Sequence, residues 1–333
     1  MFTAMKLDPD RASSLHLRVV NLGSAEAADA DSSGPVVAVC SADQMDIAAA
    51  KFWLEKATFT LTEDEVDDRR VISVPSVAAA VGDLAARVAR WPQAAAICDD
   101  VLRSVDPGAP SAQGLTTESL AYSTLQSGRE FADWLQRRGP AVSPHSPEPV
   151  LVVRQQDTLG IWLNRPERHN AFSTDMRQAL LDALTVAIYD TSIQYVVLAG
   201  SGPSFCSGGD LDEFGSFDDP ASAHFARTRY SPALALDELS TRLGDRLIAR
   251  VHGRVLGSGL EMAAFCGRVQ ADPVCDIGLP ELALGLLPGA GGTVSITRRI
   301  GRWRTAYLVL SGQSISAATA LEWGLVDEVR APT

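Results

Sequence analysis

Two strongly apolar segments in the second half of the chain each run into a turn that contains glycine. Residues 193–201 (IQYVVLAGS) lead into the turn at 202–210, and residues 246–259 (RLIARVHGRVLGSG) end in the Gly-Ser-Gly turn at 257–259. Runs of branched apolar residues without polar alternation are typical of strands buried in a parallel sheet. Helical patterns alternate with these strands, so the sequence predicts an α/β fold for this half of the chain.

Each turn is a candidate site for a negatively charged oxygen atom. Glycine lets the backbone come close to a ligand, and a helix that begins after the turn presents unbonded N–H groups to an anion. The first turn ends in Gly208, Gly209 and Asp210, where Asp210 can cap a following helix. One such turn alone is more often an ordinary strand-to-helix connection. Two of them on adjacent strands would place two N–H donors at one point, as the oxygen of an enolate requires.

Two glutamates accompany the turns and lie twenty positions apart. Glu261 follows the second turn at a predicted helix start, and Glu281 precedes the glycine-rich segment 288–292 (PGAGG). A pair of carboxylates can hold a water molecule and pass protons to and from it. The other interpretation is that one glutamate only caps a helix or pairs with an arginine.

A proline-rich segment at residues 137–149 (RRGPAVSPHSPEP) divides the chain of 333 residues into two parts of domain size. We therefore predict an N-terminal domain over residues 1–136, a linker over 137–149 and a second domain over 150–333. Within the second domain, residues 150–164 read as two strands joined by a turn. Residues 172–190 read as an amphipathic helix capped by Ser173.

The N-terminal part is predicted to be mixed but mainly helical. The expected elements are two short strands and four helices, at residues 15–20 and 35–40, and at 43–56, 76–91, 94–105 and 116–139. The last helix is expected to begin at Thr116 or Thr117 and to stop at Gly139. No group of residues in this part forms a recognisable catalytic constellation.

Charge and cysteine content exclude several classes of function. The net charge of −12 argues against general binding to nucleic acid or to an anionic membrane surface. The four arginines between positions 298 and 304 form either a local anion-binding patch or a solvated helix face. The five cysteines form no CxxC pair and no metal-ligand pattern, which indicates buried, reduced thiols. No apolar run has the length of a signal peptide or of a membrane span, so we expect a cytoplasmic protein that is not bound to a membrane.

Taken together and in order, these segments resemble the crotonase (enoyl-CoA hydratase/isomerase) superfamily over residues 150–330. The resemblance covers five segments of the sequence: LNRPERHNAFS (163–173), SFCSGGDL (204–211), VHGRVLGSGLE (251–261), LPE to GGT (279–293), and SISAA with GLVD (314–327). It implies a core built as a repeated ββα spiral, and a homo-oligomer that is a trimer or hexamer. It implies an acyl-CoA thioester as substrate and no cofactor beyond the coenzyme A that this substrate carries.

The resemblance also assigns roles to individual positions. Ser207 and Ser258 would give the two backbone N–H groups of an oxyanion hole. The residues expected along the thioester, pantetheine and coenzyme A are Arg168, Ala171, Gly208, Gly209, Asp210 and Gly257, with Gly289 next to the catalytic water. No metal ligand is implied.

Both glutamates are present in the hydratases of this family, whereas many of its isomerases and decarboxylases keep one. The resemblance thus implies an enoyl-CoA hydratase, a hydro-lyase of fatty acid metabolism, in which Glu261 activates water at C3 and Glu281 delivers a proton to C2. Other possibilities are an isomerase, a cofactor-free dioxygenase or a catalytically poor acyl-CoA-binding subunit.

Two segments depart from the family pattern. Residues 1–136 have no counterpart in ordinary hydratases, and the last family motif, at 324–327, lies close to Thr333. The C-terminal helices that usually cover the acyl pocket would follow that motif. We therefore expect the N-terminal helices, especially residues 116–137, to take over covering and assembly. The segment 211–245 is expected to form the pocket as a mobile loop plus a helix.

Overall fold

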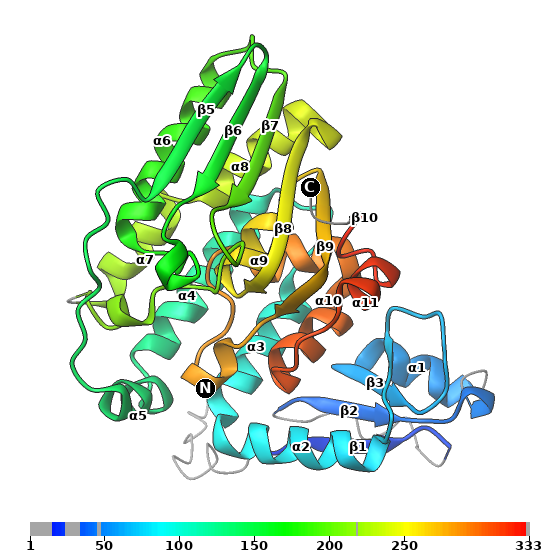
Figure 1. Cartoon of the computed structure of the whole chain (residues 1–333). Helices are drawn as coiled ribbons and strands as arrows, with labels where there is room; N and C mark the ends of the chain where they lie inside the picture. The colour runs from blue at the N-terminus through cyan, green and yellow to red at the C-terminus, as the bar shows by residue number, and fades with distance from the viewer. Residues whose placement is uncertain (1–14, 24–33, 45–47, 218, 331–333) are drawn as a thin grey trace, which may run out of the picture.

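The computed structural model describes residues 15–23, 34–44, 48–217 and 219–330, and these residues form two separate sheets (Figure 1). The larger sheet has the strand order β10-β9-β8-β7-β6-β5, and the smaller has the order β1-β2-β3-β4. The predicted α/β fold class is confirmed. None of the described helices is both long enough and apolar enough to cross a lipid bilayer.

The larger sheet is parallel apart from one hairpin at its edge. Its strands are β5 (Val150–Gln155), β6 (Thr158–Leu163), β7 (Tyr195–Gly200), β8 (Leu247–Leu256), β9 (Arg268–Gly278) and β10 (Glu328–Val329). Strands β5 and β6 pair antiparallel across the predicted turn, and β6 to β10 pair in parallel. The apolar strands β7 and β8 are neighbours, so their carboxyl ends bring the two predicted glycine turns together.

Helices of this half cover the sheet and close its ends. They are α6 (Thr174–Tyr189), α7 (Pro220–Arg229), α8 (Pro232–Leu243), α9 (Ser258–Ala263), α10 (Gly292–Ser311) and α11 (Ala317–Glu322). Short 3-10 turns are η4 (Pro166–Arg168), η5 (Leu211–Glu213), η6 (Gly244–Arg246) and η7 (Glu281–Leu284). Ser173 caps α6 as predicted, with its hydroxyl accepting the N–H of Met176. The segment expected to be a mobile loop plus one helix contains both α7 and α8, each with proline in its first turn.

The smaller sheet is entirely parallel and belongs to the N-terminal part. Its strands are β1 (Arg18–Asn21), β2 (Val36–Val39), β3 (Phe59–Thr62) and β4 (Val71–Ser73). The turn η3 (Ala42–Gln44) and helix α1 (Ala48–Lys56) lie between β2 and β3, and helices α2 (Val77–Arg90) and α3 (Pro92–Ser104) follow β4. Strands β3 and β4 were not predicted from the sequence. Part of the helix predicted over 43–56 lies outside the described residues.

The single helix predicted over 116–139 is wrong in its extent. The structure has two helices, α4 (Ser111–Gln126) and α5 (Arg129–Arg138), separated at Ser127 and Gly128. Helix α4 begins after Pro110, so Thr116 and Thr117 lie inside it, where their hydroxyls donate to the carbonyls four residues back. Gly139 ends α5 as predicted, at a φ of 75° that favours glycine.

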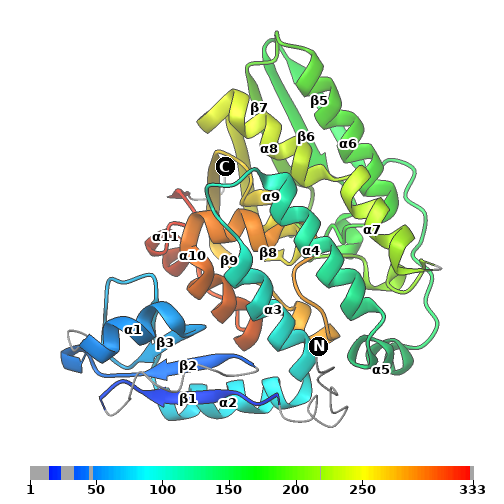
Figure 2. The same cartoon turned by 180° about the vertical axis from the view of Figure 1, so that it is seen from behind.

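One hydrophobic core joins the two halves of the chain. It contains Leu84, Leu115 and Phe131 from the N-terminal helices together with Leu198 and Leu308 from the second half. A smaller cluster around Trp53 lies between β1, β2 and α1. Viewed from behind, α3 and α4 cross the centre of the molecule, with α10 on one side and α7 on the other (Figure 2). The predicted division into domains stays a prediction.

Helix α10 is bent at Gly301, which has a φ of 79°. The part before the bend begins at the end of the glycine-rich segment 288–292. As a whole, α10 packs against α9, α3 and α4 as well as β3 and β4. The arginines at 298–304 are neither a free patch nor a solvated face. Arg298 pairs with Asp237, Arg299 pairs with Asp327, and Arg302 donates to the carbonyl of Ala57.

Candidate active site

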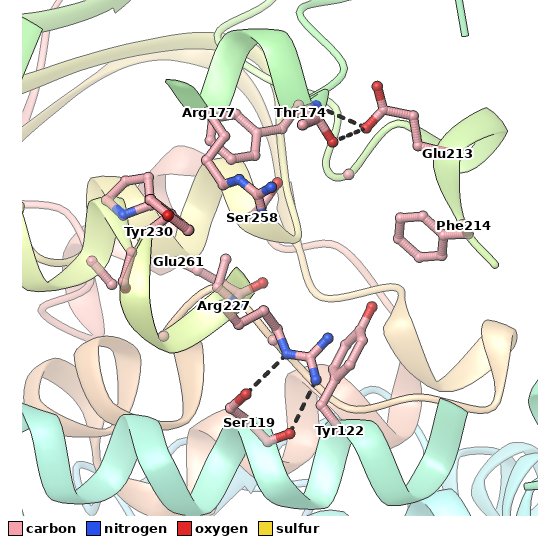
Figure 3. Close-up of a pocket in the computed structure, with 18 of the residues that line it drawn as sticks. Ser119, Tyr122, Thr174, Arg177, Glu213, Phe214, Arg227, Tyr230, Ser258 and Glu261 are labelled. Atoms are coloured by element: carbon pink, nitrogen blue, oxygen red, sulfur yellow. Dashed lines mark hydrogen bonds between the residues drawn. The ribbon is translucent and has the colours of Figure 1, made fainter. Parts of the chain in front are cut away.

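A pocket of about 190 Å³ lies where α4 faces the ends of β7 and β8 (Figure 3). Its walls come from α4, the start of α6, the segment 209–217, α7, α8 and the glycine-rich loop at 289–291. Of the predicted site residues, Gly209, Asp210, Ser258, Glu261, Glu281 and Gly289 line the pocket. The structure therefore brings together residues from three separate sequence motifs.

Glu261 lies in the first turn of α9 and is only 2% exposed. One carboxylate oxygen, Oε2, accepts the N–H groups of Ala290 and Gly292, both at 2.7 Å. Burial raises the pKa of Glu261 to about 7, against the lowering effect of these N–H donors. A carboxylate with such a pKa can take up a proton near neutral pH.

Glu281 begins η7 and is 8% exposed. Among the described residues, no hydrogen-bond donor reaches its buried Oε2 atom. Burial raises the pKa of Glu281 well above its usual range, and the charge of Glu261 raises it further. Glu281 is thus the carboxyl group of the pair that keeps its proton more strongly, and it has a free oxygen in the pocket wall.

Gly257 is required next to Glu281. A Cβ atom at this position would lie 2.4 Å from Oε1 of Glu281, and the φ of 49° also disfavours any other residue. The neighbouring turn is close as well, because a Cβ atom on Gly208 would lie 3.9 Å from the Cα atom of Gly257. The two glycine turns thus meet, as predicted from their positions after adjacent strands.

The prediction that Ser207 donates its backbone N–H to a ligand is wrong for this structure. That N–H donates to the carbonyl of His169 at 3.0 Å, and Ser207 is absent from the described residues that line the pocket. The segment 206–210 is not a regular strand, because Gly208 has a φ of 98°, and its N–H directions are set by single bridges to its neighbours. Phe172 bonds to the carbonyl of Gly208 and the N–H of Asp210, which directs the N–H of Gly209 away from Phe172.

Within the described part of the chain, the N–H groups of Gly209 and Ser258 have no hydrogen-bond acceptor. Ser258 is the first residue of α9, where helix geometry leaves the N–H unbonded. Both residues line the pocket. They form a pair of donors at the ends of β7 and β8. Ser258 is the donor predicted from the sequence, whereas the donor of the first turn is Gly209, two positions after the predicted Ser207.

Asp210 is held in a network of arginines. The buried guanidinium of Arg165 donates to Oδ2 of Asp210, and that of Arg168 donates to Oδ1, both at 2.8 Å. Although burial alone would raise its pKa, hydrogen bonds from Ser143 and Arg165 hold the pKa of Asp210 below its usual value. This network fixes the first turn in place. The sequence analysis missed Arg165, which also donates to the carbonyl of Ala171.

Five predicted site residues do not line the pocket. Arg168, Ala171, Ser207, Gly208 and Gly257 are not among the described residues that line the cavity. Arg168 pairs with both Asp210 and Asp212, and is partly exposed. Its predicted contact with coenzyme A stays a prediction.

Helix α4 supplies one wall of the pocket, and the expectation that residues 116–137 take over covering and assembly stays a prediction. Glu118, Ser119, Tyr122 and Gln126 line the cavity from α4. Arg227 of α7 donates to Ser119 (Figure 3), and it also donates to Ser123 and Gln126. The sequence analysis missed these residues. The spacing of 118, 122 and 126 places three polar side chains on one helix face, which was the available signal.

Comparisons with known proteins agree on one family. Residues 154–332 match the model of the "Enoyl-CoA hydratase/isomerase" family. The "2,3-dehydroadipyl-CoA hydratase" of Escherichia coli (strain K12) is 38% identical over 180 residues, which cover 54% of this chain and 68% of that protein. The "Enoyl-CoA hydratase, mitochondrial" of Pongo abelii is 34% identical over 178 residues, which cover 53% of this chain and 59% of that protein.

Solved structures give the same result. The enoyl-CoA hydratase of Mycobacterium smegmatis is 33% identical with a TM-score of 0.50, over 55% of this chain and 70% of that one. An enoyl-CoA hydratase/carnithine racemase from Magnetospirillum magneticum is 27% identical with a TM-score of 0.50, over 56% of this chain and 69% of that one. The chain therefore belongs to the enoyl-CoA hydratase/isomerase family, the crotonase superfamily, as a hydratase-type enzyme of the hydro-lyase class.

Proposed function

We propose that this enzyme adds water across the C2–C3 double bond of a 2-enoyl-CoA, with Glu261 as the base and Glu281 as the acid. The observation that supports the proposal is the contrast between two buried carboxyl groups in one pocket. Two N–H donors stabilise the charged form of Glu261, whereas the Oε2 atom of Glu281 has no donor among the described residues. Environments that push two pKa values apart separate the acid from the base.

In this mechanism the oxygen of a water molecule bonds to C3 while its proton moves to Glu261. The electrons of the double bond move toward the thioester, whose oxygen becomes enolate-like. The N–H groups of Gly209 and Ser258 are the proposed donors to that oxygen, and each donor typically contributes about 2.7–4 kcal/mol to such a transition state. Glu281 then gives its proton to C2, which yields the 3-hydroxyacyl-CoA.

The acyl group is expected to carry a polar or acidic end. Arg177 and Arg227 line the pocket, and within the described structure the charges of Glu213 and Glu118 act on them without a direct ion pair. Burial lowers the pKa of both guanidinium groups, which marks them as poorly solvated cations. A carboxylate at the end of the acyl chain would satisfy Arg177, and the Escherichia coli relative is named for a 2,3-dehydroadipyl thioester.

The remaining site residues keep the roles that the family resemblance implies. Gly208, Gly209 and Asp210 are proposed to border the thioester and pantetheine, with Arg168 and Ala171 further along coenzyme A. Gly257 leaves room beside Glu281, and Gly289 is proposed to lie next to the catalytic water. A trimer or hexamer in the cytoplasm is likewise part of the proposal.

The test is a comparison of Glu261→Gln and Glu281→Gln with wild type in the hydration of crotonyl-CoA and 2,3-dehydroadipyl-CoA. Removing a general acid or base typically costs about 100- to 10,000-fold in rate. We expect such a loss in kcat for both variants with KM little changed. Full rates in both would overturn the assignment. Oxygen uptake with an arylacetyl-CoA, or acyl-CoA binding without any hydration by wild type, would favour the dioxygenase or the binding subunit.

The acidic end of the substrate is tested separately with Arg177→Leu. Loss of the guanidinium should lower kcat/KM for 2,3-dehydroadipyl-CoA by about tenfold to a hundredfold, since a charge-assisted hydrogen bond contributes about 1.5–3 kcal/mol. The value for crotonyl-CoA, which has no terminal carboxylate, should change little. Equal losses with both substrates would show that Arg177 does not recognise the acyl end.

A further inference from the structure

Glu118 of α4 is a third buried glutamate beside the proposed catalytic pair. It is 2% exposed, and it lies outside residues 154–332, the segment that matches the family model. Its Oε1 atom accepts the N–H of Gly291 at 2.8 Å. Its Oε2 atom accepts the N–H of Thr293 at 3.0 Å and the hydroxyl of the same residue at 2.6 Å.

The two carboxylates share the glycine-rich loop in alternation. The N–H groups of Ala290 and Gly292 donate to Glu261, and those of Gly291 and Thr293 donate to Glu118. Four consecutive backbone donors at the start of α10 are therefore divided between two side chains on opposite sides. Since Glu261 holds its position through the same peptide segment that Glu118 binds, a shift at one carboxylate displaces the other.

We propose that Glu118 is a positioning residue for hydration, which fixes the 290–293 loop from α4 so that the loop can orient Glu261. The inference rests on the proposed function of Glu261. It assigns to the N-terminal helices a part in the chemistry of the site beyond covering the pocket.

The charge of Glu118 reaches further than its hydrogen bonds. The titratable groups that face it are Cys98 on α3, Tyr122 on α4, Arg227 on α7, Glu261 on α9 and Glu281 on η7. Burial, followed by the charge of Glu261, raises the pKa of Glu118 to about 8. When Glu118 is ionised, its charge raises the pKa of Glu281 and helps the proposed acid to keep its proton.

Two substitutions separate the position of Glu118 from its charge. Glu118→Asp keeps the charge but withdraws the carboxylate from the loop, whereas Glu118→Gln keeps the length but removes the charge and one acceptor. Misplacement of a catalytic group by about 1 Å can cost about 100-fold in rate. We expect Glu118→Asp to lower kcat by about that factor at every pH, with the alkaline limb of the kcat profile unmoved. Glu118→Gln should lower kcat and also move the alkaline limb to lower pH.

Glu130→Gln is the matched control. Glu130 is a half-buried glutamate of α5 that accepts the backbone N–H groups of Gln93 and Ala94, at 2.7 and 3.0 Å, and it does not line the described pocket. Its loss should lower thermal stability while leaving kcat and the alkaline limb at their wild-type values. A stability effect alone is thereby distinguished from an effect on the site.

The inference is overturned if wild type hydrates an enoyl-CoA and both Glu118 variants keep its kcat and pH profile. It is also overturned if Glu130→Gln reproduces the losses of the Glu118 variants. If wild type hydrates no enoyl-CoA, the proposed function fails instead. In that case binding of acetoacetyl-CoA, measured by calorimetry, still tests Glu118: its Asp variant should bind at least tenfold more weakly if the loop is displaced, and equal binding overturns the inference.

Discussion

The small sheet and helix α4 both precede the family-matched segment, yet the carboxylates that they hold have opposite surroundings. Beside the small sheet, Arg70 forms ion pairs with Glu55 and Asp68, both at 2.7 Å. Although burial alone would raise it, the pKa of Asp68 is held below its usual value by hydrogen bonds from Arg70. In α4, Glu118 forms no ion pair within the described structure, and burial raises its pKa to about 8.

The two carboxylates have opposite effects on the stability of the folded protein. A carboxylate whose pKa is lowered by its partners stabilises the folded state, whereas one whose pKa is raised destabilises it when ionised. The carboxylate beside the small sheet thus stabilises the folded protein, whereas Glu118 of α4 destabilises it when ionised. Strained or costly charges of this kind concentrate at functional sites.

The largest expected effect is the dependence of stability on pH. Glu118 and Glu261 have pKa values of about 8 and about 7, above those in an unfolded chain. Their favourable contribution is complete below about pH 4.3 and is lost as the pH rises through their folded values. We expect the free energy of unfolding, measured with urea, to fall by on the order of a few kcal/mol between pH 5 and pH 8.

Two variants sharpen that experiment. Glu118→Gln should flatten the fall, because one of the two groups no longer titrates. Asp68→Asn should lower the free energy of unfolding by the same amount at each pH from 5 to 8, so that its dependence on pH does not change. The contribution of Asp68 is lost only as the pH falls through its lowered pKa. A free energy of unfolding that rises over this range would contradict the contrast between the two regions.

A second prediction concerns the contact between α4 and the catalytic loop. A Cβ atom on Gly289 would lie 2.4 Å from the ring of Tyr122, so Gly289→Ala should push α4 and the loop apart. We expect kcat/KM to fall by about 100-fold through misplaced catalytic groups. In the control Gly82→Ala, on α2, the new methyl group meets no atom within 4 Å. That variant should keep full activity and gain about 0.5–1 kcal/mol in stability.

Two arginines that connect helices to their neighbours, Arg227 and Arg103, allow a matched comparison in which we expect effects of intermediate size. Arg227 binds α4 through Ser119, Ser123 and Gln126, and Arg103 binds the sheet region through the carbonyl of Lys56. Arg227→Leu should raise KM by about tenfold, since it removes charged hydrogen bonds that contribute about 1.5–3 kcal/mol each. Arg103→Leu should lower the melting temperature and leave KM unchanged. A higher KM in Arg103→Leu would show that the sheet region also shapes the pocket.

The smallest effect on catalysis is expected from the sheet core. Trp53 is 1% exposed in the cluster between β1, β2 and α1. Trp53→Ala should lower the free energy of unfolding by about 3–5 kcal/mol. The kcat/KM of the folded fraction should equal that of wild type, measured at a temperature well below the transition. A tenfold loss there would erase the distinction between the two regions.

The sequence was informative where chemistry and periodicity coincide. The long strands β7 and β8, the Ser173 cap and both glutamates could be predicted, because each depends on a local pattern. The N–H directions in the 206–210 turn could not be predicted, since they are set by the pairing of Cys206 with β8 and of Gly209 with Phe172. Because this pairing is not visible in the sequence, Ser207 was predicted as the donor in place of Gly209.

Contacts between distant segments were the other limit. Glu118 reads as a polar residue in the first half of a helix, and nothing near it in the sequence indicates its partners at 291 and 293. Its bonds to them span more than 170 positions. Such a pairing depends on how α4 and α10 pack, which no local pattern specifies.

The bend at Gly301 has a consequence for how changes spread through the molecule. Before it, α10 carries the peptide groups that the two glutamates share; after it, Trp303 lies against Arg69, next to the strand β4. The helix α10 thereby contacts both regions, and the residue at its bend, Gly301, has a φ that favours glycine. Substitutions where α10 contacts the small sheet are therefore the ones in that region that share a helix with the glycine-rich segment of the site.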